Sequence, residues 1–172
     1  MINDSNVTIQ TVLPILKDVT IFSGFSDDEI GRICESCTVL DAKEGELIVE
    51  EKTPAKEIFI QLKGRANVVL NIREAPIELM EFGPGSCIGE ASVIGIQNHS
   101  ASVVITENST LLVLSRQVLM NIFENDKAIF SLLILNIARE IARRLHHTDE
   151  TLLHYGKLDK KHHQILNRHM RG

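Results

Sequence analysis

The spacing of apolar residues changes twice along the chain, and these changes divide it into three parts. Before residue 38, apolar residues recur every three or four positions in two short segments, which predicts two helices. The first covers about residues 7–19. The second begins at Ser26, where Glu29 three positions later completes a capping box.

From Thr38 to Ser115 the apolar residues fall instead into short runs that are typical of β-strands. Turn residues separate these runs, namely Gly45, Pro54, Lys63-Gly64, Ala75-Pro76 and Gly83-Pro84-Gly85. Many short strands without intervening helices favour a sandwich or jelly roll over a doubly wound parallel sheet. The runs are residues 38–40, 46–49, 57–62, 65–70, 77–82, 102–105 and 110–114.

Helical spacing returns at Ser115, a good N-cap residue. A second helix start at residues 125–126 predicts a long helix that ends near Gly156, with residues 157–172 frayed or weakly helical. Roughly thirty residues make such a helix about 45 Å long. Its apolar residues alternate at intervals of four and three, which is typical of a coiled-coil seam and favours pairing with a second copy of the chain. If the helix instead folded back onto its own domain, that contact would account for the apolar residues in only the first half of the seam. The seam residues are Ile134, Ala138, Ile141, Leu145, Thr148, Leu152 and Tyr155.

The 172 residues carry a net charge of −5, and 44% of them are apolar and 24% charged. These values exclude a disordered chain and a disulfide-stapled miniprotein. No apolar run approaches the roughly 18 residues of a membrane span, and the N-terminus lacks the pattern of a signal peptide. The three cysteines, an odd number, fit a reducing compartment. We therefore expect a cytoplasmic protein without a membrane segment.

The charge is unevenly distributed. Residues 139–172 hold eight Lys and Arg against four Asp and Glu, a balance of +4, which leaves −9 for the preceding 138 residues. The same stretch holds six of the seven histidines. A basic tail on an acidic body favours contact of the tail with another molecule, and a solvated tail without a specific contact is the alternative. The acidic pI of 5.8 argues against a dedicated nucleic-acid binder.

The most informative segment runs from Gly85 to Val103. It contains an apolar residue, then Gly89-Glu90-Ala91, a short loop, and Ser100-Ala101 leading into a strand. With the strand entry at residues 44–48, this pattern resembles the cyclic-nucleotide-binding domain of the catabolite activator protein superfamily. The resemblance covers roughly residues 18–150. It implies a mainly β fold, an eight-stranded antiparallel jelly roll with flanking helices and a long C-terminal dimerisation helix.

The resemblance also sets the expected domain boundaries. Residues 1–25 are an N-terminal helical segment, 26–125 the β-roll, 126–155 the long helix and 156–172 a basic, histidine-rich tail. Transcription factors of the family carry a winged helix-turn-helix after the long helix. The 17 residues that follow Tyr155 are too few for that module, so we expect no direct DNA binding.

The residue types of this segment fit a cyclic phosphate and its ribose. Gly89 has no Cβ and lets the backbone approach a ligand closely. The N–H groups of Ala91 and Ser92, at the start of a short helical turn, can donate to phosphate oxygens, as can the hydroxyl of Ser100. The carboxylate of Glu90 only accepts, so its natural partner is the ribose 2′-hydroxyl.

Three residues complete or alter the family pattern. By resemblance, Thr148 and Asp149 occupy the helix positions that reach the purine, and Asp149 replaces a hydroxyl residue of the catabolite activator. His99 stands where the family has a phosphate-binding arginine, whose charged, bidentate fork a neutral histidine lacks. A charge-assisted hydrogen bond contributes roughly 1.5–3 kcal/mol, so its loss weakens binding about ten- to a hundredfold.

These observations lead to one functional expectation and its alternatives. We expect a stand-alone sensor module that binds cyclic AMP (cAMP) or cyclic GMP (cGMP), weakly because of His99, and signals through its C-terminal helix to an unidentified protein partner. The site could instead bind another ligand. It could also be a vestige in a ligand-independent dimeric scaffold.

Other chemistry finds less support in the sequence. Cys34 and Cys37 have the spacing of a redox motif or half a zinc site, but no second cysteine pair follows, and two cysteines on an apolar helix face are more often part of a core. The histidines lack the i, i+4 pair that binds a metal on one helix, so no metal site is expected. No nucleophile–base signature is present, so we expect no enzyme.

Overall fold

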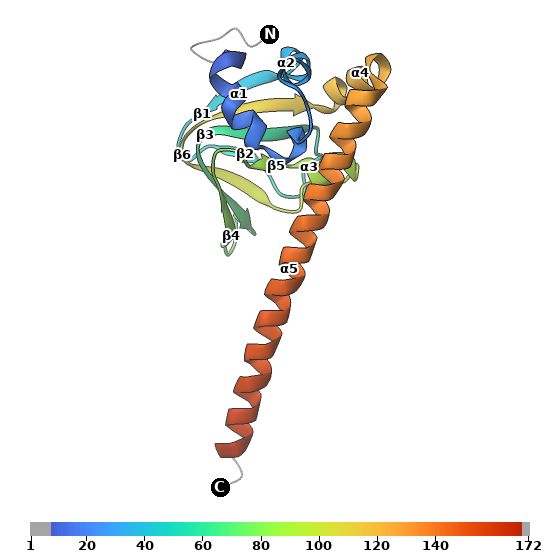
Figure 1. The fold of residues 1–172 in the computed structure, drawn as a ribbon. Coiled ribbons are helices and arrows are strands. Elements are labelled where there is room, and N and C mark those ends of the chain that lie inside the picture. Colours follow the sequence, from blue (N-terminus) through green and yellow to red (C-terminus); the bar gives the residue numbers. More distant parts are fainter. Residues whose placement is uncertain (1–7, 170–172) are drawn as a thin grey trace. The chain divides into compact units, whose positions relative to one another are not determined.

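The structure is a computed structural model that describes the backbone of residues 8–169 and the side chains of residues 8–153 (Figure 1). The chain divides into two units, residues 1–137 and residues 138–172. All described strands belong to the first unit, and the described residues of the second, 138–169, are the later part of one long helix.

Two α-helices and a short 3-10 helix precede the sheet: α1 (Ile9–Asp18), η1 (Thr20–Phe22) and α2 (Asp27–Glu35). The predicted capping box at the start of α2 is confirmed. Ser26 Oγ accepts a hydrogen bond from Glu29 N at 3.4 Å, and Glu29 Oε2 accepts one from Ser26 N at 2.8 Å. The reciprocal bonds satisfy amides that a helix start leaves without an intrahelical partner, which is why the helix begins here.

The described strands form one six-stranded antiparallel sheet. The order along its main path is β1-β6-β3-β4, while β2 pairs with β6 and β5 pairs with β3. The mainly β class with flanking helices is therefore confirmed. The strands are β1 (Thr38–Ala42), β2 (Leu47–Val49), β3 (Glu57–Leu70), β4 (Ile77–Phe82), β5 (Cys87–Ile88) and β6 (Ser102–Ser115).

The predicted count of eight strands is not confirmed. β3 and β6 each join two of the seven predicted runs, and β5, which lies outside those runs, brings the described strands to six. Gly64, expected to make a turn, lies inside β3 at φ +81°, where the register with β6 shifts. A Cβ at this position would lie 2.4 Å from Asn108 O, so only glycine lets the two strands stay paired through the irregularity. The bend is a bulge between continuous strands rather than a loop.

The sheet encloses an apolar core that fixes its register. Burial of a large aliphatic or aromatic side chain contributes about 1.5–3 kcal/mol, and a one-residue slip would turn these side chains outward. The buried residues of this cluster are Ala42, Val49, Phe59, Ala66, Phe82, Ile88, Val103, Ile105, Leu111 and Val113.

Two helices follow the sheet: α4 (Arg116–Asn125), capped by Ser115, and α5 (Lys127–His169). Within the first unit, Asn136 of α5 donates to Ile21 O at 3.1 Å and to Ser23 O at 2.7 Å, which ties the start of α5 to η1. No helix in the described part of the chain is long and apolar enough to cross a membrane.

The prediction that the long helix ends near Gly156 is wrong, since α5 continues to His169. A single glycine inside a helix costs only about 1 kcal/mol relative to alanine. Several residues beyond it, the lysines, leucines, arginine and glutamine, are good helix formers. The side chains of Tyr155 and of the histidine-rich tail lie outside those that the structure describes.

Candidate functional site

The segment between β5 and β6, here called the cassette (residues 87–102), contains most of the predicted site residues. It begins with β5, which pairs with β3, continues through Gly89 into the short helix α3 (Glu90–Ile94), and returns through a loop to β6. Gly89 has φ +86°, a conformation that favours glycine. A Cβ at Gly89 would lie 3.0 Å from Glu57 O and 3.5 Å from His99 Cε1. The turn therefore requires glycine and brings the His99 ring beside it.

The first turn of α3 positions the predicted phosphate and ribose contacts. Glu90 is the first residue of this helix and is only 1% exposed, so its carboxylate faces the interior of the first unit. Ala91 and Ser92 follow in the same turn, where helix amides have no intrahelical acceptor. Ser100 is exposed at the other end of the loop. The structure thus gathers Gly89, Glu90 and His99 in one segment of fixed backbone.

His99 is half-buried, and burial lowers the pKa of its imidazole below the ordinary value of 6.5. Desolvation disfavours the charged form of a histidine. At neutral pH the ring is therefore uncharged, with one nitrogen able to donate and the other to accept. The cassette has no permanent positive charge at the position where the family pattern has an arginine.

The turn between β2 and β3 supports the cassette loop through backbone hydrogen bonds. Lys52 N donates to His99 O at 2.8 Å, and His99 N donates to Thr53 O at 2.9 Å. An isolated β-bridge joins Pro54 to Asn98 next to them. The loop is thus held as an extra strand-like segment, and residues 52–54 lie directly beside it. The sequence predicted a turn at Pro54 but not its contact with the cassette.

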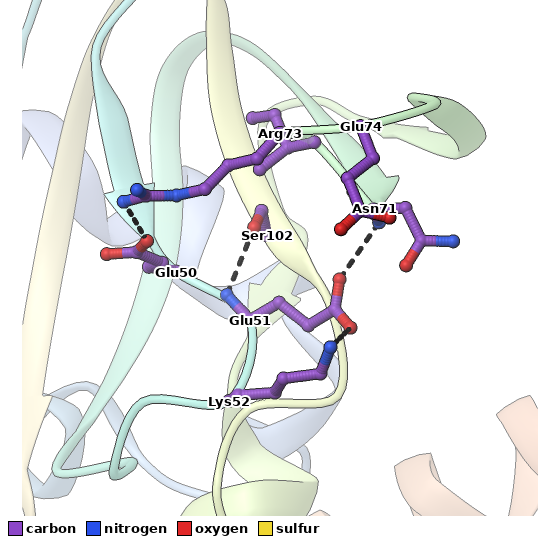
Figure 2. A pocket seen from close by; sticks show the side chains of 8 residues that line it. Glu50, Glu51, Lys52, Asn71, Arg73, Glu74 and Ser102 are labelled. Atoms are coloured by element: carbon purple, nitrogen blue, oxygen red, sulfur yellow. Dashed lines mark hydrogen bonds and ion pairs between the residues drawn. The ribbon is translucent and has the colours of Figure 1, made fainter.

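A cavity of about 170 Å³ opens beside this turn (Figure 2). Arg73 forms an ion pair with Glu50, and Lys52 Nζ lies 3.4 Å from Glu51 Oε1. The other Glu51 oxygen accepts from Asn71 N at 2.9 Å. Ser102, the last residue of the cassette, closes one side, where its hydroxyl accepts from Glu51 N at 3.0 Å. The cavity is lined mainly by polar and charged residues, and among them Glu50 pairs with Arg73 and Glu51 with Lys52.

Arg116, the first residue of α4, connects the cassette to the helices that follow. Its Nη2 atom donates to Ala55 O at 2.8 Å and lies 3.4 Å from Val93 O in α3. Its backbone N–H donates to Lys56 O at 2.8 Å. One guanidinium thus links α3, the β2–β3 turn and α4. The sequence pattern gave no signal for this residue, because the contacts bring together segments more than 20 positions apart.

Thr148 and Asp149 lie on α5 in the second unit, and their proposed contact with a purine stays a prediction. The Thr148 hydroxyl donates to Arg144 O at 2.9 Å within its own helix. Two turns earlier, Glu140 accepts from Arg143 and Arg144, and these bonds lower the pKa of its carboxyl.

The cysteines belong to the core. Cys34, Cys37 and Cys87 are free and buried. Burial raises the pKa of Cys34 to about 12 and also raises that of Cys37, so neither thiol is reactive at neutral pH. Among the described residues, no group of three or more His, Cys, Asp or Glu is placed to hold a metal ion.

Comparison with known proteins places this geometry among related folds. The family model of the cyclic nucleotide-binding domain matches residues 39–126. A cyclic nucleotide-binding domain from Methylobacillus flagellatus KT has a TM-score of 0.75 at 23% identity, over 84% of this chain and 82% of that one. The Thermus thermophilus catabolite activator protein has a TM-score of 0.69 at 23% identity, over 77% of this chain and 61% of that one. The regulatory domain of Toxoplasma gondii PKA, in a co-crystal structure with cAMP, has a TM-score of 0.63 at 20% identity, over 76% of this chain and 50% of that one.

Proposed function

The chain belongs to the cyclic nucleotide-binding domain family, and on this premise we propose that it is a non-enzymatic regulatory module that binds cyclic AMP or cyclic GMP in the cassette. The observation that carries this proposal is the geometry of Gly89, whose left-handed backbone opens α3 directly beside the His99 ring. Charged phosphate favours the amide-rich start of a helix.

Each cassette residue has a distinct role in this proposal. The amides of Ala91 and Ser92 and the hydroxyl of Ser100 donate to the phosphate oxygens. Glu90, held inside the first unit, accepts from the ribose 2′-hydroxyl. Neutral His99 donates one uncharged hydrogen bond, so we expect an affinity about ten- to a hundredfold lower than an arginine would give.

The output of the module is proposed to pass through its C-terminal helices. Arg116 bonds the last turn of α3 and begins α4, and α4 leads directly into α5. Ligand in the cassette would stabilise one arrangement of these helices over another. On α5, Leu145 and Leu152 of the predicted seam are 61% and 64% exposed, which supports homodimerisation through that face and contact with a downstream protein partner.

A second candidate function is a ligand-independent dimeric scaffold with a vestigial pocket. The lowered pKa of His99 favours it, because the cassette lacks the charge that normally holds the phosphate. In that case the cassette would be retained only for the fold.

Titration calorimetry with cyclic AMP and cyclic GMP distinguishes the two functions. We expect binding by the wild-type protein and a loss of at least tenfold in Glu90→Gln, which keeps the size of the side chain but removes its charge. Glu124→Gln, a change at an exposed glutamate of α4, serves as the control and should bind as the wild type does. Absence of binding to both nucleotides at millimolar concentration would favour the scaffold.

A further inference from the structure

Lys52 has an unusual backbone conformation at the edge of the cassette. It is one of three residues other than glycine with positive φ in the described part of the chain, at +68°. Its amide donates to His99 O, so the two Cα atoms are held on adjacent strand-like segments. Such conformations are disfavoured and are often found at functional sites. The conformation keeps Lys52 next to the residue that replaces the expected arginine.

The basic residues around the cassette differ in how firmly their side chains are held. Arg116 donates to the main-chain oxygens of Ala55 and Val93, and Arg73 pairs closely with Glu50. His99 is uncharged at neutral pH because burial lowers its pKa. The side chain of Lys52, in contrast, is 82% exposed and reaches Glu51 only at 3.4 Å. Its ammonium is therefore held less firmly than the guanidinium groups of Arg73 and Arg116.

Glu51 is suited to hold this ammonium while the site is empty. Its side chain is only 16% exposed, and one oxygen is fixed by the amide of Asn71 at 2.9 Å, which leaves the other oxygen toward Lys52. Figure 2 shows Lys52 and Glu51 on the same side of the cavity. The Lys52 end of this pair is 82% exposed and the two charged atoms are 3.4 Å apart, so the pair is weak and a bound anion can compete with Glu51 for the ammonium.

We propose that Lys52 supplies the positive charge that His99 does not, by moving its ammonium from Glu51 to the phosphate of the bound cyclic nucleotide. The inference rests on the proposed function, because it assigns a further phosphate contact in the same site. The charge comes from the β2–β3 turn instead of from the cassette itself. Glu51 competes with the ligand for the ammonium and so reduces the affinity.

The test compares cyclic AMP, which has the phosphate, with adenosine, which does not. Lys52→Gln should weaken cyclic AMP binding about threefold to tenfold, since the contact is partly exposed, and should reduce its salt dependence. Adenosine binding should not change. Glu51→Gln, which can still accept from the Asn71 amide, should strengthen cyclic AMP binding. Lys56→Gln is the matched control, because it removes an exposed charge from the same turn.

The outcomes separate this inference from the proposed function. If the wild-type protein binds neither cyclic AMP nor cyclic GMP, the proposed function fails and the role of Lys52 fails with it. If the wild type binds and Lys52→Gln binds equally well, only the role of Lys52 is wrong. Equal weakening by Lys52→Gln and Lys56→Gln, or parallel weakening for adenosine, would also overturn it, because the effect would not be specific to the phosphate contact.

Discussion

Replacing His99 with arginine is expected to strengthen binding of cyclic AMP and to remove most of its pH dependence. Burial holds the pKa of His99 below 6.5 in the unliganded protein. A phosphate monoanion beside the ring would favour its charged form and raise the pKa of the complex. Binding would then take up a proton, so the affinity of the wild-type protein should rise as pH falls from 8 to 6.

The size of the effect follows from the position of the ring. His99 Cε1 would lie 3.5 Å from a Cβ at Gly89, so the ring is close to the turn that opens α3. An arginine there restores a charged, bidentate contact in a half-buried site, worth about 1–3 kcal/mol or roughly five- to a hundredfold in affinity. If the pKa of His99 is one unit higher in the complex than in the free protein, the wild-type affinity at low pH rises by at most about tenfold.

Calorimetric titration at several pH values measures both effects in one experiment. Asn98→Arg is the matched control, because it places the same charge on the neighbouring exposed residue of the loop. The reasoning is refuted if wild-type affinity is constant between pH 6 and pH 8, or if Asn98→Arg improves binding as much as His99→Arg does. If His99→Arg binds neither nucleotide, the missing arginine is not the limiting defect.

Two further predictions concern association and stability. The double variant Leu145→Glu, Leu152→Glu should be a monomer by light scattering. Leu153 is similarly exposed, at 63%, but lies off the predicted seam, so Leu153→Glu should stay a dimer. An unchanged dimer in the double variant would contradict the seam. Ile96 is β-branched, has φ +52° and is 78% exposed, so Ile96→Asn should raise the free energy of unfolding by about 0.5–1 kcal/mol in urea denaturation. Ile96→Val, which is still β-branched, should not raise it. No gain from asparagine would mean that this backbone is not strained.

The sequence pattern pointed to local parts of the candidate site but not to its non-local contacts. Gly89 and Glu90 stand in a short contiguous motif whose residue types carry their own chemistry, so both could be proposed as site residues without a structure. The hydrogen bond between Lys52 and His99 joins residues 47 positions apart. Because only main-chain atoms form it, it does not determine which side chains occur at these positions. The burial that lowers the pKa of His99 depends on the same packing.

Two glycines show the same limit of prediction from the sequence. Gly64 and Gly156 look alike to a sequence pattern, and both predicted a break. At Gly64 the register shift between β3 and β6 accommodates the residue, and at Gly156 the helix continues because one glycine is a small penalty. The Ser26 and Ser115 caps were predicted well, since capping depends on residues only three positions apart.

Hydrogen exchange measured peptide by peptide tests the central claim most directly, because it locates a bound ligand as well as detecting it. Adding cyclic AMP to the wild-type protein should slow exchange at the amides of Ala91 and Ser92 and in the Lys52–Pro54 turn, and Glu90→Gln should lose this protection at the same ligand concentration. Protection confined to other parts of the chain, or unchanged exchange in the cassette at saturating nucleotide, would contradict the claim that the cassette is the binding site.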